Sequence, residues 1–407
     1  MDVDKPLMAR QPILDAKGVT FAYELLCRSI PMSTEALQSS NGNLATGEIL
    51  LAAFLDIGID NITGGLPAFV NMTESWLSMP PAIKSDKLVV EILEYVPPTD
   101  ANIAAVKALR QQGFRVALDD FTGDEVQRGW LPYVDIVKVD VMDVQAHTSS
   151  AELVSSNRNP GLIWLAEKVE AIEDYERLKS EGYQLFQGFF FSRPALLYGE
   201  RKQDSQYAVL RLINELNNPD NTTRDISTAI QSDPQLSYRI LQFINSASVS
   251  SVNKVTSIHQ AVTMAGVKRI LGWANMLALG RLDNKPRALL EQALSRAYIC
   301  QMLAKHLPPT DDQTAYTVGM FSLLNAFVDE PMAEVCDRLQ LSDAMSDALL
   351  RGDGIYGEIL KVATLMSEGR LEDIRNVPRG IDPGIFAEVQ QSAFLEVGNQ
   401  LRLCGIA

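Results

Sequence analysis

The sequence predicts two domains of different fold class, a (β/α) barrel over residues 1–200 and an all-helical domain over residues 201–407. Two observations lead to this prediction. Short apolar runs alternate with amphipathic helical stretches in the first half, whereas the second half shows helical patterns alone. The length of 407 residues also suits about two or three domains. We expect the break between them in the polar segment Tyr198–Ser205.

Seven candidate strands stand in the first half: Val19–Leu26, Ala68–Met72, Leu88–Leu93, Arg115–Asp119, Asp135–Asp140, Leu162–Ala166 and Gln184–Phe189. Amphipathic runs between them predict helices at Leu44–Ile57, Ala101–Gln112 and Glu170–Glu181. Gly113 and Gly182 follow two of these runs, where a left-handed residue commonly ends a helix. Strand–helix alternation favours a parallel sheet, and this number of strands favours closure into a TIM-like α/β barrel.

The second half has apolar residues at helical spacing and no convincing strand. The helices expected there are Gln206–Leu216, Thr223–Gln231, Gln235–Ile244, Ile258–Ala265, Val267–Leu279, Arg287–His306, Ala315–Val328, Ala333–Leu339, Ala344–Leu350, Gly357–Glu368 and Ile385–Leu403. Asp225, Ser257 and Asp312 are suitable residues for the first turn or cap of their helices.

Composition excludes several classes of protein. The net charge is −15, of which −12 falls in residues 1–200 and −3 in residues 201–407, so non-specific binding to DNA or anionic membranes is not expected. The four cysteines form no C-x-x-C pair, and the three histidines are scattered, so any metal site must use oxygen ligands. No apolar run reaches the about 18 residues of a membrane helix, and Met1–Arg10 lacks a signal-peptide pattern, so we expect a cytoplasmic protein.

Polar residues stand at or just after the carboxyl ends of the predicted strands. They are Glu24, Asn71, Glu91, Asp119, Asp120, Lys138, Glu167 and Gln187. A single residue of this kind is more often a turn or cap residue. In a (β/α) barrel, however, these strand ends face one mouth, where such side chains converge. Carboxylate and amide oxygens suit hard cations such as Mg²⁺, Mn²⁺ or Ca²⁺, and paired aspartates suit two-metal hydrolysis of phosphodiesters.

The motifs around these residues resemble those of the EAL family, bacterial proteins that bind or hydrolyse cyclic di-GMP. Tyr23–Arg28 resembles the signature E-A-L-x-R, with Leu25 in place of alanine. The other motifs follow in the order of the family: Phe69-Val70-Asn71, Glu91-Ile92-Leu93-Glu94, Asp119-Asp120-Phe121, Lys138-Val139-Asp140, Glu167-Lys168-Val169-Glu170 and Gln187–Pro194. The resemblance covers about Arg10–Pro194.

The resemblance implies a role for each of these residues. Glu24, Asn71, Glu91 and Asp119 would hold a first metal ion, and Asp119 with Asp120 a second. Lys138 and Glu167 would position and activate the attacking water, Arg28 would contact a ligand phosphate, and Gln187 would support the water or the substrate. The activating ion would be Mg²⁺ or Mn²⁺, with Ca²⁺ as an inhibitor.

One loop departs from the family pattern. After Asp119-Asp120-Phe121, active members usually carry a G-T-G-Y-S-like loop that orders the second metal site and the dimer interface. Here the chain reads Thr122–Gly129, and the loop is shorter, with Lys138 only 19 positions after Asp119. A supporting loop that lets ligands drift by about 1 Å lowers the rate, so this departure argues against fast turnover.

The second half resembles the HDOD family over Ile226–Leu279. The residues that carry the resemblance are Asp233-Pro234-Gln235-Leu236, Asn245-Ser246-Ala247, Ile258–Val262 and the segment Ala265-Gly266-Val267. That family is an all-helical relative of the HD phosphohydrolases that lacks their metal ligands. This sequence agrees, because the segment Gly319–Ala326 stands where such a relative would show Leu-Leu-His-Asp and carries leucine and asparagine instead. His259 is expected to be packed or capping, and His306 to lie near a helix end.

Three hypotheses for function follow. In the first, a divergent, catalytically weak or inactive barrel senses cyclic di-GMP or binds partners, and the HDOD half couples it to an unknown protein. In the second, the barrel is an active metal-dependent cyclic di-GMP phosphodiesterase. In the third, the chain is an interaction scaffold that binds no nucleotide. A homodimer is compatible with each.

Overall fold

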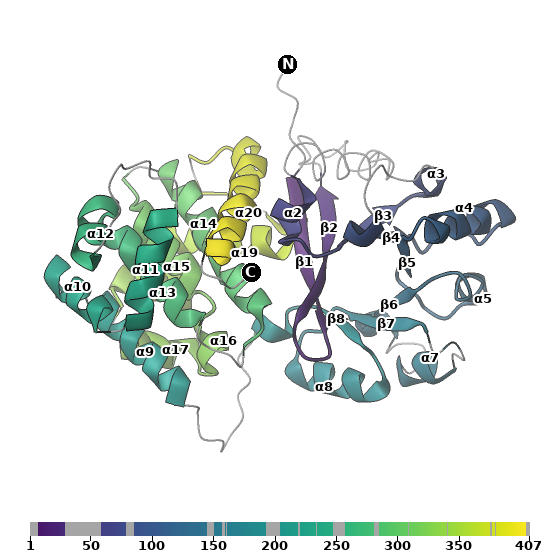
Figure 1. The fold of residues 1–407 in the computed structure, drawn as a ribbon, viewed down its shortest axis with the longest axis horizontal. Coiled ribbons are helices and arrows are strands. Elements are labelled where there is room, and N and C mark those ends of the chain that lie inside the picture. The colour runs from purple at the N-terminus through teal and green to yellow at the C-terminus, as the bar shows by residue number, and fades with distance from the viewer. Residues whose placement is uncertain are drawn as a thin grey trace. The chain divides into compact units, whose positions relative to one another are not determined.

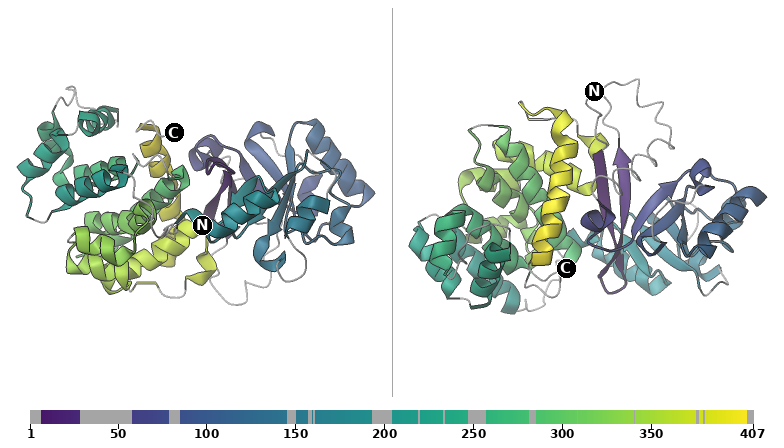
Figure 2. Two further views of the ribbon diagram at one scale, coloured as in Figure 1. Left: turned by 90° about the horizontal axis from the view of Figure 1, so that it is seen from below. Right: turned by 45° about the horizontal axis from the view of Figure 1, so that its top comes forward.

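The computed structural model describes residues 7–28, 58–78, 85–144, 150–156, 159, 161–192, 204–218, 220–232, 234–246, 257–280, 285–307, 309–339, 341–374, 377–378 and 380–403. The chain divides into two compact units, Met1–Phe191 and Ser192–Ala407, the first built on a sheet and the second on helices (Figures 1 and 2). Both predicted fold classes are therefore confirmed. The predicted break at Tyr198–Ser205 lies mostly outside the described residues, and the boundary at residue 200 stays a prediction.

The first unit is a closed barrel whose eight strands neighbour one another in chain order. The strands are β1 (Leu7–Asp15), β2 (Thr20–Arg28), β3 (Ala68–Met72), β4 (Leu88–Ile92), β5 (Arg115–Leu118), β6 (Ile136–Asp140), β7 (Ile163–Glu167) and β8 (Leu185–Gln187). Strands β2 to β8 are parallel. All seven predicted strands are present, and no end is shifted by more than two residues.

Strand β1 was not predicted, and it runs antiparallel to both β2 and β8. The expected parallel sheet is thus confirmed for β2 to β8, and β1 adds one antiparallel strand that the sequence analysis did not include. Arg10, Gln11 and Pro12 interrupt the apolar run of β1, and proline argues against a central strand. Pro12 is tolerated because β1 pairs with β8 only over Ile13–Asp15.

Short helices connect the strands of the barrel. They are α2 (Ile59–Thr63), α3 (Glu74–Leu77), α4 (Asp100–Gln111), α5 (Glu125–Arg128), α6 (Val141–Val144), α7 (Ser150–Ser156), α8 (Ile172–Glu181) and the 3₁₀ turns η3 (Ser85–Lys87) and η4 (Phe190–Ser192). The predicted helices Ala101–Gln112 and Glu170–Glu181 are confirmed as α4 and α8, and Leu44–Ile57 lies outside the described residues. Gly182 ends α8 with a φ of 105°, as predicted from its position.

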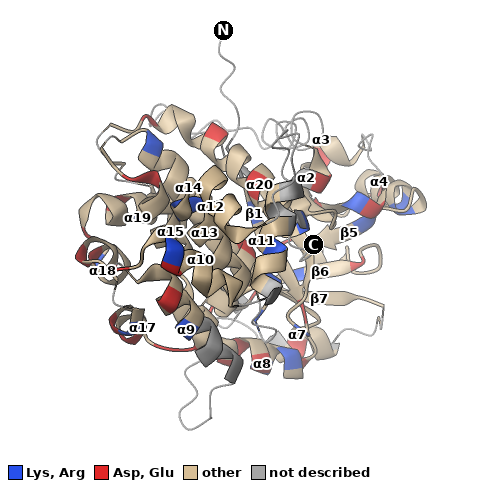
Figure 3. Cartoon of the chain, turned by 60° about the vertical axis from the view of Figure 1, so that its left-hand side comes forward, with Lys and Arg blue, Asp and Glu red and all other residues tan. Residues whose placement is uncertain are grey.

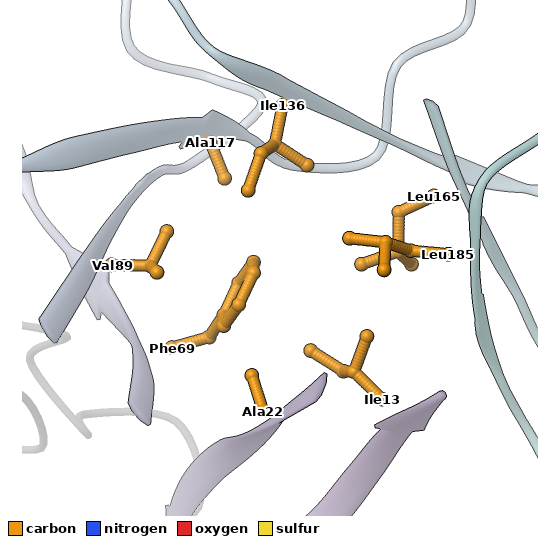
Figure 4. Close-up of a cluster of buried hydrophobic side chains, with 8 residues drawn as sticks. All are labelled: Ile13, Ala22, Phe69, Val89, Ala117, Ile136, Leu165 and Leu185. Atoms are coloured by element: carbon orange, nitrogen blue, oxygen red, sulfur yellow. The ribbon is translucent and has the colours of Figure 1, made fainter. Parts of the chain in front are cut away.

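One apolar side chain from each strand fills the centre of the barrel. Figure 4 shows this layer, which consists of Ile13, Ala22, Phe69, Val89, Ala117, Ile136, Leu165 and Leu185. The Phe69 ring occupies the middle, and its relative exposure is 0%. The small side chains of Ala22 and Ala117 leave room for this ring, so the layer packs large against small residues.

Replacing Phe69 with alanine is expected to destabilise the protein by about 3–5 kcal/mol. The cause is a cavity left among the side chains that the other seven strands contribute to this layer. Thermal unfolding followed by circular dichroism measures the loss. Tyr95→Ala is the matched control, because that ring is 63% exposed and its removal opens no cavity. Equal transition temperatures for the two variants would contradict the central role of Phe69.

The second unit is helical throughout its described residues. Its helices are α9 (Asp204–Asn217), α10 (Thr223–Gln231), α11 (Pro234–Ser246), α12 (Ile258–Ala265), α13 (Val267–Leu279), α14 (Arg287–Lys305), α15 (Asp312–Phe321), α16 (Leu324–Val328), α17 (Met332–Leu339), α18 (Asp343–Leu350), α19 (Gly354–Glu368) and α20 (Phe386–Leu403), with 3₁₀ turns η5 (Leu371–Asp373) and η6 (Pro383–Ile385). The predicted helices are confirmed with one exception, the helix expected over Ala315–Val328.

That segment forms two helices, α15 and α16, with a break at Ser322 and Leu323. The Ser322 hydroxyl donates to the Gly319 carbonyl at 2.7 Å and accepts a hydrogen bond from the Arg296 guanidinium at 3.3 Å. A serine that bonds back to the preceding turn competes with the helical ladder. Arg296 is buried and also pairs with Glu368 at 2.8 Å, so the break is anchored to the core of the unit.

The helix ends follow the cap chemistry expected from the sequence. The Ser257 side chain accepts from the Gln260 N–H at the start of α12, and Asp225 forms a capping box with Thr222 at the start of α10. His306 is the C-terminal cap of α14, as predicted. His259 is exposed on α12, so the prediction that it packs is wrong, since it faces away from the buried Ile258 and Ala261.

Among the helices described here, none has the length and apolar character needed to span a membrane. Acidic and basic residues occur together on surface helices, as on α4 in Figure 3, which carries Asp100, Lys107 and Arg110. The strong negative charge of the sequence is thus accompanied by basic residues on this helix.

Candidate active site at the barrel mouth

The site residues lie one layer above the apolar centre of the barrel. Alternate residues of a strand point to the same side, so the residue two positions beyond each core residue also faces the interior. On the parallel strands these residues are Glu24, Asn71, Glu91, Asp119, Lys138, Glu167 and Gln187. On the antiparallel β1 the equivalent residue is Gln11, two positions before Ile13 and in register with Glu24. The structure thus gives the predicted residues a common layer at the carboxyl ends of the parallel strands.

Lys138 lies at the centre of four carboxylates. Its Nζ is 2.9 Å from Glu24 Oε1, 2.7 Å from Glu91 Oε1, 2.8 Å from Asp119 Oδ1 and 3.0 Å from Glu167 Oε1. The lysine side chain is 1% exposed. Burial alone lowers the pKa of a lysine, but these carboxylates outweigh burial and hold the pKa of Lys138 well above its ordinary value. The ammonium is therefore a fixed positive charge.

A single ammonium does not balance the carboxylates around it. Burial raises the pKa of Glu91 well above its usual value; the charges of Glu24 and Asp119 raise it further, against the opposing charge of Lys138. Burial likewise raises the pKa of Glu167 to about 8, with Lys138 opposing and Asp119 and Glu24 adding to the rise. We call the four carboxylates of Glu24, Glu91, Asp119 and Glu167 the carboxylate ring. More positive charge in this ring would lower both pKa values and stabilise the carboxylates as anions.

A second acidic group adjoins the ring at the mouth. One carboxylate oxygen from each of Glu94, Asp119 and Asp120 lies within 4.8 Å of the others, a spacing that could hold a metal ion. Burial and the charge of Asp119 raise the pKa of Asp120 to about 6. Glu94 was quoted as part of a motif but not taken as a ligand. Its position three residues after Glu91 places it just beyond β4, which is the signal that could have identified it.

Gln187 bonds to the oxygen of Glu24 that Lys138 does not contact. Its Nε2 donates to Glu24 Oε2 at 2.5 Å and to Gln11 Oε1 at 2.8 Å. Glu24 therefore uses one oxygen for Lys138 and the other for Gln187. Gln11 was missed because β1 itself was not predicted.

Gly188 fixes the position of Gln187. With φ at 149° it brings its Cα so close to Val169 that an added Cβ would lie 2.0 Å from the Val169 carbonyl oxygen. The Val169 N–H donates to the Gln187 carbonyl at 3.0 Å. A glycine is therefore required here, and the ends of β7 and β8 are held together just above Glu167 and Gln187.

Arg28 was predicted as a site residue, and Lys168 was quoted only as part of a motif. Arg28 is the last residue of β2, opposite Leu7, and its side chain lies outside the described part of the structure. Lys168 stands where the resembled motif has glycine; its φ is 56°, and it forms an ion pair with Asp140. The phosphate contact expected of Arg28 stays a prediction.

The donor set fits hard divalent cations. Every ligand candidate offers oxygen. In the fully buried Glu91, Oε1 meets the Lys138 ammonium at 2.7 Å, whereas Oε2 has no hydrogen-bond partner. Buried carboxylate oxygens without donors are costly unless a cation meets them. The Lys138 ammonium already occupies such a position, so the ring is arranged for positive charge.

The described residues of the helical unit hold no comparable group of three His, Cys, Asp or Glu side chains. Asn325, which belongs to the segment that the sequence analysis compared with a metal-binding motif, lies in α16. In the same unit the buried Arg296 pairs with Glu368 at 2.8 Å, and Arg370 lies 3.6 Å from the same glutamate.

Comparison with known protein families supports the family resemblance of each half of the chain. The family model "EAL domain" matches residues 52–194, and the model "HDOD domain" matches residues 205–334. The first match begins after Glu24, so the place of Glu24 at the site rests on its own motif and on the geometry of the barrel.

Two curated relatives span most of the chain. The "Uncharacterized protein YuxH" of Bacillus subtilis is 32% identical over 92% of this chain and 94% of its own length. The "Cyclic di-GMP phosphodiesterase CdgJ" of Vibrio cholerae is 30% identical over 87% of this chain and 83% of its own. Among solved structures, the YkuI protein of Bacillus subtilis, with an EAL domain in complex with c-di-GMP and calcium, is 18% identical, covers 57% of this chain and 73% of that chain, and has a TM-score of 0.36. That structural likeness is too distant to support an inference about this site.

Proposed function

This chain belongs to the family of signalling proteins that join an EAL domain to an HDOD domain, and on that premise we propose that its barrel hydrolyses cyclic di-GMP to the linear dinucleotide. The observation that carries the proposal is the ring of four carboxylates around the buried Lys138. A relative named as a cyclic di-GMP phosphodiesterase aligns over 87% of the chain.

We assign the residues as the motif resemblance implies. Glu24, Asn71, Glu91 and Asp119 would hold a first divalent cation, and Asp119 with Asp120 a second. Glu94 lies close enough to Asp119 and Asp120 to join the second site. When bound, Mg²⁺ or Mn²⁺ would supply positive charge that acidifies water and offsets the phosphate charge. Ca²⁺ is expected to bind without supporting turnover.

The protein's own residues would transfer the proton, position the carboxylates and bind the phosphate. Glu167 is placed to accept the proton of the attacking water, because it lies in the ring and burial gives it a raised pKa of about 8. Lys138 holds the carboxylates in one place, and Gln187 orients Glu24. Arg28 would contact a phosphate of the ligand. Water adds to phosphorus as the bond to the 3′-oxygen breaks, and that oxygen takes a proton from solvent.

The HDOD half serves, in this proposal, as a binding module that couples the barrel to a protein partner. Its described residues contain no cluster suited to a metal, and its buried charges are paired internally. A protein partner of unknown identity, a homodimer and a cytoplasmic location are predictions that accompany the proposal.

Incubating the full chain with cyclic di-GMP and Mn²⁺ and separating the products by chromatography tests the proposal. We expect the linear dinucleotide from the wild type and none from Glu24→Ala, since that change removes a carboxylate bonded to both Lys138 and Gln187. Glu173→Ala, an exposed site on α8, is the matched control and should retain activity. Calorimetric binding with Ca²⁺ but no product would indicate a sensor instead, and neither binding nor product a scaffold.

A further inference from the structure

The loop that departs from the resembled family carries a strained ligand candidate. Asp120 follows β5 directly after Asp119, and its φ is 41°. A non-glycine residue pays a steric cost in this left-handed region, so surrounding contacts must hold it there. The backbone on either side is tied down, because Asp119 N donates to the Ile92 carbonyl at 2.9 Å and Phe121 N to the Lys138 carbonyl at 2.9 Å.

The side chain of Gln127 supplies the contacts at Asp120 itself. Its Nε2 donates to the Asp120 carbonyl at 2.9 Å, and its Oε1 accepts from the Thr122 N–H at 2.8 Å and the Thr122 hydroxyl at 3.0 Å. The residue is 5% exposed, so these bonds are shielded from water. One amide group thereby closes the turn from Asp120 to Thr122.

Gln127 is held in turn by its own short helix. The Asp124 side chain accepts from the Gln127 N–H at 2.7 Å and caps α5. The segment after α5 is docked on the loop that follows β4, because the buried Trp130 donates from Nε1 to the Val96 carbonyl at 2.9 Å. That loop carries Glu94, so both loops that contribute to the acidic group at the mouth are connected through this segment.

We propose that Gln127 is a positioning residue of the active site: its side-chain amide holds the Asp120–Thr122 turn so that the Asp120 carboxylate is presented beside Asp119 and Glu94. A glutamine amide carries its donor and its acceptor on separate atoms, and this turn uses both: Nε2 donates to Asp120 and Oε1 accepts from Thr122. The inference rests on the proposed function. It assigns to Gln127 the ordering of the second cation site, a task that the G-T-G-Y-S-like loop performs in the resembled family and that Thr122–Gly129 replaces here.

The test compares Gln127→Leu and Gln127→Glu with the wild type. Leucine removes all three side-chain bonds, whereas glutamate keeps the shape and the acceptor but cannot donate to the Asp120 carbonyl when ionised. We expect kcat for cyclic di-GMP to fall about 10- to 100-fold in both variants while KM stays near the wild-type value, because an ångström-scale displacement of a catalytic group costs about that much. Titration of the metal-free proteins with Mn²⁺ alone should show one tight site retained and the second weakened.

Gln112→Leu is the matched control, because that glutamine is exposed at the end of α4 and should change neither quantity. Circular dichroism separates a folding defect from a local one, and Gln127→Glu keeps the test valid where leucine prevents folding. Wild-type kcat and Mn²⁺ affinity in Gln127→Glu would overturn the role of Gln127 while leaving the phosphodiesterase proposal intact. A wild type that binds two Mn²⁺ ions but yields no product would overturn the phosphodiesterase, and weakening of the second ion in the variants would still support the positioning role.

Discussion

Replacing Lys138 with methionine is expected to destabilise the metal-free protein by about 3–5 kcal/mol, because a buried ion pair that loses one partner leaves uncompensated charge in the interior. Here one ammonium, 1% exposed, meets the carboxylates of Glu24, Glu91, Asp119 and Glu167. Methionine keeps the length and the packing of the chain but removes the charge. The carboxylates then face one another without a cation at their centre.

Divalent cations should reverse most of that loss. A metal ion that binds the folded but not the unfolded chain stabilises it in proportion to the logarithm of its concentration over its Kd. Thermal unfolding in EDTA and in Mn²⁺ measures both effects, and the rise caused by Mn²⁺ should be larger in Lys138→Met than in the wild type. Lys179→Met, 41% exposed on α8, is the control. If Lys138→Met unfolds in EDTA at the wild-type temperature, the ammonium is not the counter-charge that holds the ring.

The position of the site could be predicted from the sequence because strand geometry is periodic. Once Phe69, Val89 and Ala117 are recognised as inward-facing, the residues two positions later must face the same interior, one layer nearer the mouth. The eight-stranded closure converts these separate strand ends into one ring. Local patterns were sufficient here, since each residue's direction depends only on its own strand.

The missed parts depend on contacts between distant residues. Gln11 was overlooked because Arg10 and Pro12 mask the alternation of β1, whose partners β2 and β8 alone reveal it as a strand. The direction of β1 could not follow from strand–helix alternation either, because a four-residue turn and no helix joins it to β2.

The loop shows the limit of motif comparison. Its divergence was visible as a changed and shortened sequence, and the expected consequence was poorly ordered ligands. In the structure, Gln127 and Trp130 order the same segment through side-chain bonds to the carbonyls of Asp120 and Val96. Such bonds have no periodic signature, because a glutamine seven residues from its acceptor has the same local pattern whether it is buried or exposed.

Replacing Glu167 with glutamine is expected to lower the rate of cyclic di-GMP hydrolysis by about 10²–10⁴-fold, the usual contribution of a general base. The amide is nearly isosteric but cannot accept the proton of the attacking water. Binding of cyclic di-GMP should persist or strengthen, because one negative charge is removed from a site that meets two phosphates. Calorimetry with Ca²⁺ gives the affinity, and chromatography with Mn²⁺ gives the rate.

The pH dependence separates loss of a base from loss of structure. Burial raises the pKa of Glu167 to about 8, so its basic form increases as pH rises and wild-type hydrolysis should rise with it, at lower pH once cations lower that pKa. Glu167→Gln has nothing to titrate at this position, and its residual rate should vary less over the same range. Glu176→Gln, exposed on α8, should keep the wild-type profile. A Glu167→Gln profile parallel to that of the wild type would move the base to another residue of the ring, because the rise would then belong to a group that the substitution left in place.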